Sequence, residues 1–289
     1  MNDRTVVFLV AVATMGMAVL PAVAQAPRHE TTAVANGVYQ FRWQGHNGFF
    51  VVTSAGVVAV DPISAEAAAT YAAEIKRVAP GASLLAVVYS HDHADHATGA
   101  TVLRRAMGNE RAPIFAQDLA LPKIRAANAP DLPPPDSTFA DRKILQYGGR
   151  TVELRYLGKS HSDNMLVVYL PQDRVVFAVD FVSNDRMGYR DLPDYHFPEF
   201  FTALERLQQM DYQTIVFGHG PPGDKATVDR QIRYYADLRA AVDQAVRQGW
   251  SEDRAAAEVK LPAYERWGSY VEWFPLNVRA LHRWLAAAR

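Results

Sequence analysis

Residues 90–96 read SHDHADH and directly follow an apolar run, residues 84–89, that predicts a β-strand. Three histidines and two aspartates therefore fall within six residues at the end of this strand. Placing such a cluster near a core is costly unless a cation neutralises it, and zinc and iron accept both imidazole and carboxylate ligands. Because side chains alternate along an extended chain, we expect His91, His93 and Asp95 to converge, with His96 joining them from the following turn. The alternative is a polar, histidine-rich surface loop.

The composition is that of an ordinary globular protein. The chain has 289 residues, of which 49% are hydrophobic and 21% charged, and its formal net charge is −1. A net charge so close to zero gives no electrostatic footprint for nucleic acid, so we expect a small-molecule substrate and no nucleic-acid partner. The absence of cysteine excludes disulfides, thiolate metal ligands and a cysteine nucleophile. The oligomeric state is left open.

The N-terminus has a different character from the rest of the chain. An apolar stretch, residues 5–20, follows Arg4 and precedes Pro21 and a run of small residues that ends in Ala24-Gln25-Ala26. This pattern predicts a secretory signal peptide, residues 1–26, cleaved after Ala26, and hence a periplasmic or secreted protein. An uncleaved membrane anchor is the alternative, but about 20 apolar residues are needed to span a bilayer and this run is shorter. We expect no stable membrane insertion after cleavage, and a single domain, residues 27–289, with a C-terminal helical segment.

Hydrophobic periodicity predicts two strand-rich halves, each followed by helices. In the first half we expect strands at 38–43, 48–53, 56–61, 84–89 and 113–116, and helices at 64–79, 98–107 and 118–127. A proline-rich loop, residues 129–137, separates the two halves. In the second half we expect strands at 143–147, 151–157, 165–170, 174–179 and 214–217, and helices at 198–210, 224–248, 251–259 and 274–288. This order predicts an α+β fold with two sheets packed face to face and helices outside.

The His-x-His-x-Asp-His pattern at residues 91–96 resembles the signature of the metallo-β-lactamase fold hydrolases. Later stretches resemble the same family: a loop containing His161 followed by the apolar run MLVVYLP, Asp180 at the end of a predicted strand, and the Gly-His-Gly around His219. The resemblance covers most of the chain after residue 36. It implies an αβ/βα four-layer sandwich, the metallo-β-lactamase fold, with metal ions at one edge of the sheets.

The resemblance further implies seven ligands that two ions share. For the first ion they are His91, His93 and His161, for the second they are Asp95, His96 and His219, and Asp180 would touch both. We therefore expect two Zn²⁺ ions per chain, with iron or manganese as the alternatives. Asp95 is also expected to be catalytic, because it can orient the nucleophile and pass a proton.

Two residues near this pattern have competing interpretations. Asp61 ends the predicted strand at 56–61, and it is either a turn residue or, as the resemblance implies, a group that supports the metal loop from behind. His46 lies in a turn between two predicted strands, and we expect it to face solvent rather than bind a metal, although in the family this loop borders the substrate cleft.

In function, the resemblance implies a dinuclear zinc-dependent hydrolase, in which a metal-bound hydroxide attacks the carbonyl of a lactam, lactone or other ester or amide. Residues 158–183 resemble the subclass B1 β-lactamases, but Asp180 stands where that group has its ligand cysteine, and Ser183 stands where it has a substrate-anchoring lysine. Arg186 or Arg190 could supply an anion anchor instead. The alternatives are a mononuclear iron persulfide dioxygenase-like oxidoreductase, a phosphodiesterase of the same fold, and a metal-binding scaffold protein without enzymatic activity.

Overall fold

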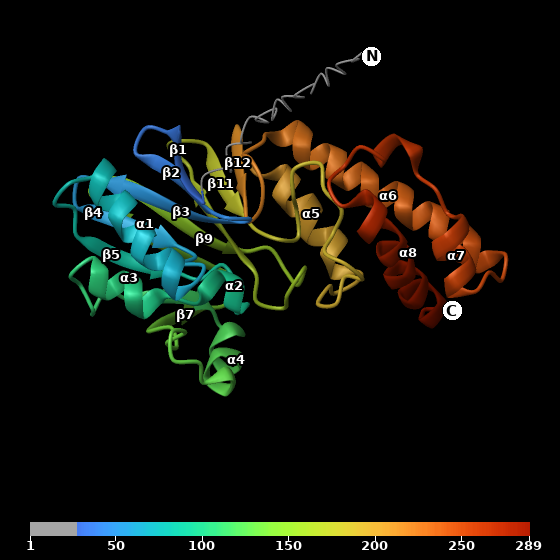
Figure 1. Cartoon of the computed structure of the whole chain (residues 1–289), viewed down its shortest axis with the longest axis horizontal. Helices are drawn as coiled ribbons and strands as arrows, with labels where there is room; N and C mark the ends of the chain where they lie inside the picture. Colours follow the sequence, from blue (N-terminus) through green and yellow to red (C-terminus); the bar gives the residue numbers. More distant parts are fainter. Residues whose placement is uncertain (1–27) are drawn as a thin grey trace, which may run out of the picture.

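The computed structural model describes residues 28–289, so the predicted signal peptide and its cleavage site lie outside the described residues. Two β-sheets pack against each other, and helices lie outside them (Figure 1). The predicted combination of two packed sheets with outer helices is therefore confirmed. Among the helices of residues 28–289, none has the length and apolar character needed to cross a membrane.

The first sheet has seven strands in the order β1-β2-β3-β4-β5-β6-β7. They are β1 His29–Ala35, β2 Val38–Trp43, β3 His46–Thr53, β4 Gly56–Val60, β5 Leu84–Val88, β6 Ile114–Gln117 and β7 Ser137–Phe139. Strands β1 to β4 are antiparallel neighbours, whereas β4 to β7 run parallel.

Strands β1 and β7 are absent from the predicted strands, each for a physical reason. β1 is a largely exposed edge strand, so its sequence HETTAVA lacks the apolar alternation of a half-buried strand. β7 has three residues, and it begins at the last residue of the predicted proline-rich loop, residues 129–137. Its pairing with β6 is a tertiary contact that no local pattern encodes.

The second sheet has five strands in the order β12-β11-β10-β9-β8. They are β8 Arg142–Tyr147, β9 Arg150–Tyr156, β10 Leu166–Leu170, β11 Val175–Ala178 and β12 Thr214–Phe217. All five agree with the predicted strands to within one residue at each end, because their apolar runs are bounded by turn residues. The sheets meet through buried aromatic rings: Phe49 of β3 stacks on Phe177 of β11, with ring centroids 5.2 Å apart.

Successive residues of β3 and β4 face opposite sides of the first sheet. Phe49 and Val58 belong to the core between the sheets, while Phe50 and Val57 pack under helices α1 and α3 on the other side. This alternation gives the layers helix, sheet, sheet, helix, as the predicted αβ/βα sandwich requires. The helices are α1 Ala65–Val78, α2 Ala94–Ala97, α3 Ala100–Ala106, α4 Ala120–Ala127, α5 Glu199–Gln209, α6 Lys225–Arg247, α7 Glu252–Glu258, η1 Pro262–Tyr264 and α8 Tyr270–Ala287.

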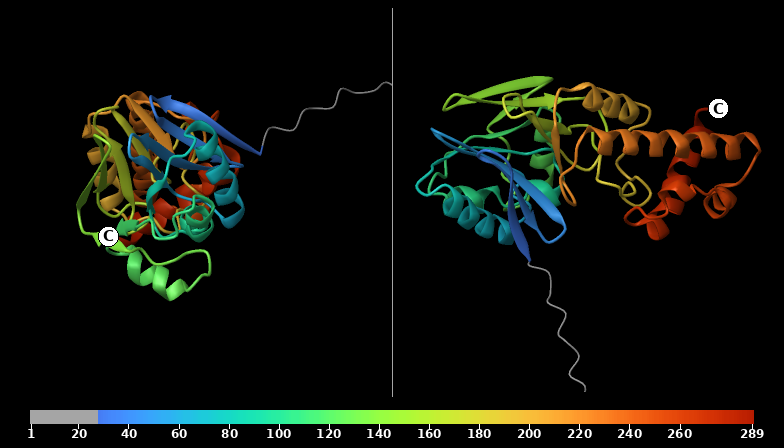
Figure 2. Two further views of the ribbon diagram at one scale, coloured as in Figure 1. Left: turned by 90° about the vertical axis from the view of Figure 1, so that its left-hand side faces the viewer. Right: turned by 90° about the horizontal axis from the view of Figure 1, so that it is seen from above.

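Two helix predictions need correction. The helix predicted at 98–107 is preceded by a separate short helix, α2, and Gly99 divides the two with a φ of 103°. A Cβ at Gly99 would lie 2.4 Å from Ser64 O, so only glycine fits there. The last helix begins at Tyr270 rather than at 274, and Pro275 lies inside it. Helices α6 to α8 extend beyond the sheets, as Figures 1 and 2 show.

Candidate metal centre

The candidate ligands gather where parallel strands of both sheets end. In the first sheet β4 and β5 run parallel, and the SHDHADH stretch follows β5 closely. In the second sheet β11 and β12 run parallel, with Asp180 just beyond β11 and His219 just beyond β12. His161 comes from the loop between β9 and β10. Because parallel neighbours end at the same edge of a sheet, residues far apart in the sequence meet at this point.

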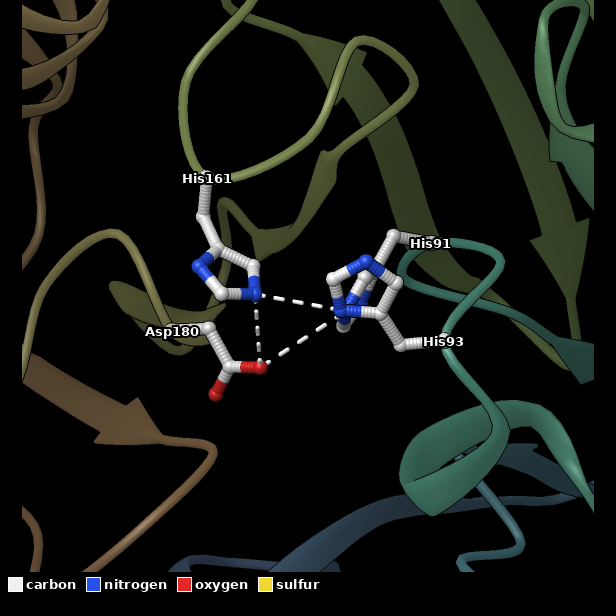
Figure 3. A group of neighbouring side chains, drawn as sticks. All are labelled: His91, His93, His161 and Asp180. Atoms are coloured by element: carbon white, nitrogen blue, oxygen red, sulfur yellow. Dashed lines mark hydrogen bonds and ion pairs between the residues drawn. The ribbon is translucent and has the colours of Figure 1, made fainter. Parts of the chain in front are cut away.

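Four side chains form the first ligand group, and Figure 3 shows them: His91, His93, His161 and Asp180. One potential ligand atom of each lies within 4.8 Å of those of the others. His161 Nε2 is 3.1 Å from His93 Nδ1, and Asp180 Oδ2 is 3.5 Å from His91 Nε2. Four nitrogen and oxygen atoms facing one point suit a four-coordinate zinc ion.

The second group consists of His96, Asp180 and His219. His96 Nε2 lies 3.2 Å from Asp180 Oδ2, and His219 Nε2 lies 3.1 Å from Asp180 Oδ1. Asp180 therefore belongs to both groups, one carboxylate between two sets of imidazoles. Asp95 is grouped with His46 and His219, and its Oδ2 lies 4.0 Å from His96 Nε2. The structure thus brings all seven predicted residues to one centre, while their assignment to particular ions remains a prediction.

His46 is partly exposed, as expected, but its ring also lies against the ligand cluster. Its Nε2 lies 3.2 Å from Asp95 Oδ2, and its ring centroid lies 4.8 Å from that of His219. The reason is tertiary: the β2–β3 hairpin is fastened to the loop after β12. Asn47 N donates to Gly218 O at 2.8 Å, and His219 Nδ1 donates to Gly45 O at 2.7 Å. No local signal in the sequence could show that these two loops meet.

Asp61 supports the metal loop from behind, so the second of its two interpretations is confirmed. Its buried carboxylate accepts hydrogen bonds from Ser90 N at 2.8 Å and from Ser90 Oγ at 2.7 Å, and His96 Nδ1 lies 3.2 Å away. Ser90 Oγ in turn accepts from His91 Nδ1 at 3.0 Å. Because the Nδ1 atoms of His91 and His96 donate backwards, their Nε2 atoms are the ring nitrogens that face Asp180 and could bind a metal ion.

The electrostatics of the centre favour a bound cation. Burial lowers the pKa of His91 well below its usual value and lowers the pKa of His161 to about 4, so both rings are neutral. Although burial opposes it, the imidazoles of His96 and His219 hold the pKa of Asp180 well below its usual range. Burial also lowers the pKa of His96, but the Asp180 carboxylate outweighs it and raises that pKa well above the usual value. A metal ion would replace the His96 proton as the partner of this anion.

The residues present fit a metal site by a second test as well. His91 Nε2 and His96 Nε2 are buried and have no hydrogen-bond partner among the described residues. Buried polar atoms are normally satisfied, so each such atom requires an explanation. Both atoms lie at 3.2–3.5 Å from the same carboxylate oxygen of Asp180, and cations bound there would satisfy them.

The ligands open into a cavity of about 590 Å³. Its walls include the hairpin at Gly45 and His46, the loop after β11, and Trp273 of α8. Asp194 also lines this cavity, and its Oδ2 lies 3.7 Å from His93 Nε2. The other ring nitrogen of His93, Nδ1, is the one that faces His161. Neither Asp194 nor Trp273 is predicted from the sequence, because neither belongs to a motif.

This fold, with imidazole and carboxylate ligands at one edge of two packed sheets beside an open cavity, defines a metal-dependent hydrolase. The family model of the metallo-beta-lactamase superfamily matches residues 41–219, and the chain belongs to that superfamily. Strand β1 and helices α6 to α8, with Trp273 in α8, lie outside the matched residues.

Several known proteins are similar to this chain. The alpha and beta subunits of 2,4-dinitroanisole O-demethylase from Nocardioides sp. (strain JS1661) are each 27% identical, over 73% and 81% of this chain and 63% and 73% of their own lengths. Metallo-beta-lactamase type 2 from Bacillus sp. (strain 170) is 28% identical over 62% of this chain and 68% of its own length. The solved structure of a metallo-beta-lactamase from Pontibacter korlensis superposes with a TM-score of 0.60 and 25% identity, covering 71% of this chain and 97% of that one. The similarity to the alpha subunit thus spans less than two thirds of that relative.

Proposed function

We propose that the protein is a dinuclear zinc-dependent hydrolase that cleaves a lactam, lactone or other ester or amide at its carbonyl carbon. The observation that carries the proposal is the position of Asp180, whose carboxylate lies 3.1–3.7 Å from ring nitrogens of four histidines in two ligand groups. A carboxylate shared in this way suits two adjacent cations. Bound there, two zinc ions would supply a hydroxide nucleophile near neutral pH and polarise the substrate oxygen.

The chain itself supplies the groups that move and hold a proton. Asp95 is half exposed, and its Oδ2 is hydrogen-bonded to His46 Nε2 at 3.2 Å. Although burial raises it, this bond with His46 holds the pKa of Asp95 below its usual value, so Asp95 is ionised. An ionised carboxylate beside the ligand cluster can orient a water molecule and accept its proton. We therefore assign Asp95 as the catalytic residue and His46 as its partner.

Metal analysis joined to a substrate panel tests this proposal. We expect about two zinc equivalents per chain, and turnover of at least one chromogenic lactam, lactone or ester. The names of the demethylase relatives add an activated aryl methyl ether to the panel. One tightly bound iron with oxygen uptake on persulfides would contradict the proposal, as would cleavage of a phosphodiester alone or the absence of any turnover.

Asp180→Asn tests the dinuclear site directly. The exchange does not strain the backbone, because Asp180 has a φ of 58° and asparagine, like aspartate, tolerates the left-handed region. We expect zinc content to fall from about two equivalents to about one. Turnover should fall by more than roughly 10–100-fold, which is the usual effect of removing a residue that only supports a metal ligand. Asp185→Asn is the matched control, since Asp185 also has a positive φ, of 46°, but pairs with Arg230.

We also propose that the protein is exported, on the strength of the signal-peptide pattern ending at Ala26. Cell fractionation followed by N-terminal sequencing tests this. A mature chain that begins at Pro27 in the periplasm or medium is the expected result, and an intact Met1 in the cytosol would contradict it.

A further inference from the structure

Arg186 is an unusual cation in the wall of the metal cavity. Its guanidinium is half buried, yet it makes no ion pair or hydrogen bond with any residue between 28 and 289. The adjacent acid is not available to it, because Asp185 pairs with Arg230 at 2.8 Å. Burial lowers the pKa of Arg186 from its usual value, and the Asp180 carboxylate, which lies among the ligand histidines, offsets this only in part. Partly buried charges are normally paired, so this position calls for an anion from outside the chain.

The backbone of Arg186 is held firmly in place. Its carbonyl oxygen accepts hydrogen bonds from Ser183 Oγ at 3.1 Å and from Gln231 Nε2 at 3.3 Å. Arg186 also forms an isolated parallel β-bridge with Gly268, where a Cβ would lie 3.2 Å from Arg186 Cγ. A side chain positioned in advance loses little freedom on binding a ligand.

One aromatic ring lies against this cation, and a second extends from the first. The Arg186 guanidinium carbon lies 4.6 Å from the centroid of the Trp273 ring, a distance at which the cation and the ring attract each other. Tyr189 meets Trp273 edge-on, with centroids 5.2 Å apart, and 47% of Tyr189 is exposed. Trp273, Tyr189 and Arg186 all line the same cavity as the candidate ligands. The wall therefore joins an unpaired planar cation to exposed aromatic surface.

We propose that Arg186, Tyr189 and Trp273 form a subsite for a planar aromatic group that carries a negative charge, such as an aryl carboxylate, at the end of the substrate away from the scissile bond. The inference rests on the proposed hydrolase function, because it names the substrate class of the same cavity. The guanidinium fork pairs with the anion, and the aromatic rings contact the planar group. Ser183 then has a different task from a charged anchor: its hydroxyl fixes Arg186.

A pair of ester substrates tests the subsite on the metal-replete protein. Phenyl acetate and 4-carboxyphenyl acetate share the acetyl group and the aromatic ring and differ in the carboxylate. We expect kcat/KM to favour the carboxylated ester by about 10–100-fold, the range of a charge-assisted contact. Arg186→Gln should remove that preference, because KM for 4-carboxyphenyl acetate should rise far more than KM for phenyl acetate.

Three variants separate recognition from packing and from general charge. Arg186→Lys keeps the charge without the planar fork, and it should retain a reduced preference if the protein is folded normally. Arg190→Gln removes one charge from the same loop; its guanidinium lies 5.9 Å from the Tyr189 ring centroid but does not line the cavity, so the variant should largely keep the preference. Trp273→Leu should weaken both aryl esters relative to ethyl acetate. An Arg190→Gln effect equal to that of Arg186→Gln, or no preference in the wild type, would overturn the subsite.

A binding measurement distinguishes failure of the subsite from failure of the proposed function. Calorimetric titration of the metal-replete protein with benzoate and with acetate needs no turnover. If both carboxylates bound only through the metal ions, their affinities would be similar. We expect benzoate to bind at least 10-fold more tightly than acetate, and Arg186→Gln to reduce this difference by weakening benzoate more than acetate. Equal affinities in the wild type would refute the subsite even if the esters are hydrolysed, whereas tight benzoate binding without any ester turnover would refute only the hydrolase proposal.

Discussion

Asp61 controls the centre at the residue scale without facing the cavity. It is fully buried and holds both Ser90 and the Nδ1 atom of His96, so it fixes which ring nitrogen of His96 remains free. The carboxamide of asparagine has the same shape as the carboxylate of aspartate but carries no charge. The backbone tolerates the exchange, because asparagine accepts the φ of 52° at this position.

We expect Asp61→Asn to lower zinc affinity at the second ligand group by about 10–100-fold. We also expect it to lower the free energy of unfolding by about 1.5–3 kcal/mol, the range of a hydrogen bond to a charged group. Zinc titration with a chromophoric chelator and urea unfolding measure the two effects. Ser90→Ala, which removes one donor to the same carboxylate, should give a smaller change in both. Unchanged zinc affinity in Asp61→Asn would show that the hydrogen bonds of Asp61 hold the loop without affecting its ligands.

The sequence predicts the identity of the ligands far better than their neighbours. His91, His93, Asp95 and His96 stand in one short pattern, so their type and spacing can be read directly. His46 cannot be found in this way, because it joins the site only when the β2–β3 hairpin docks on the loop after β12. The same holds for other long-range contacts, which depend on packing between distant segments.

At the scale of elements, strands bounded by turn residues were predictable, and elements defined by pairing were not. The five strands of the second sheet were each found to within one residue, whereas β1 and β7 exist through their partners β2 and β6. Helix α8 begins four residues before its predicted start and carries Pro275 inside. Proline is best tolerated in the first turn of a helix, so a local pattern places the start near it.

Helix α8 also fixes the loop that forms one wall of the cavity. Asn277 is fully buried, and its Nδ2 donates to Gly188 O at 2.9 Å and to Arg190 O at 2.6 Å. Its Oδ1 accepts from Tyr234 Oη of α6 at 2.8 Å. One side chain therefore ties a helix from outside the matched family region to the loop beside the metal centre.

We expect Asn277→Ala to lower the free energy of unfolding by about 2–3 kcal/mol, because it leaves a buried hydroxyl and two carbonyls without partners. Urea unfolding gives the size of the loss, and zinc content should stay at the wild-type value, since no ligand is touched. The double variant Tyr234→Phe/Asn277→Ala removes the stranded hydroxyl and should recover about 1 kcal/mol. A double variant that is less stable than Asn277→Ala alone would contradict this account.

At the scale of the whole molecule, the candidate centre joins the two sheets. His91, His93 and His96 follow β5 of the first sheet, while Asp180 and His219 follow strands of the second. Away from this edge the sheets are held by apolar contacts such as the Phe49–Phe177 stack. Metal ions bound at the edge would thus connect two halves of the fold that are far apart in the sequence, and their binding energy would add to folding stability.

We expect chelation with excess EDTA to lower Tm by about 5–10 °C, because a ligand present at 100 times its Kd contributes about 2.7 kcal/mol and each kcal/mol corresponds to roughly 2–4 °C in a protein of this size. Calorimetry measures the shift, and adding zinc back should restore the original Tm. In Asp180→Asn the same treatment should give a clearly smaller shift, because the carboxylate common to both ligand groups is lost. Hydrogen exchange should locate the loosening at the ends of both β5 and β11, and faster exchange confined to one sheet, or an unchanged Tm, would show that the metal does not connect them.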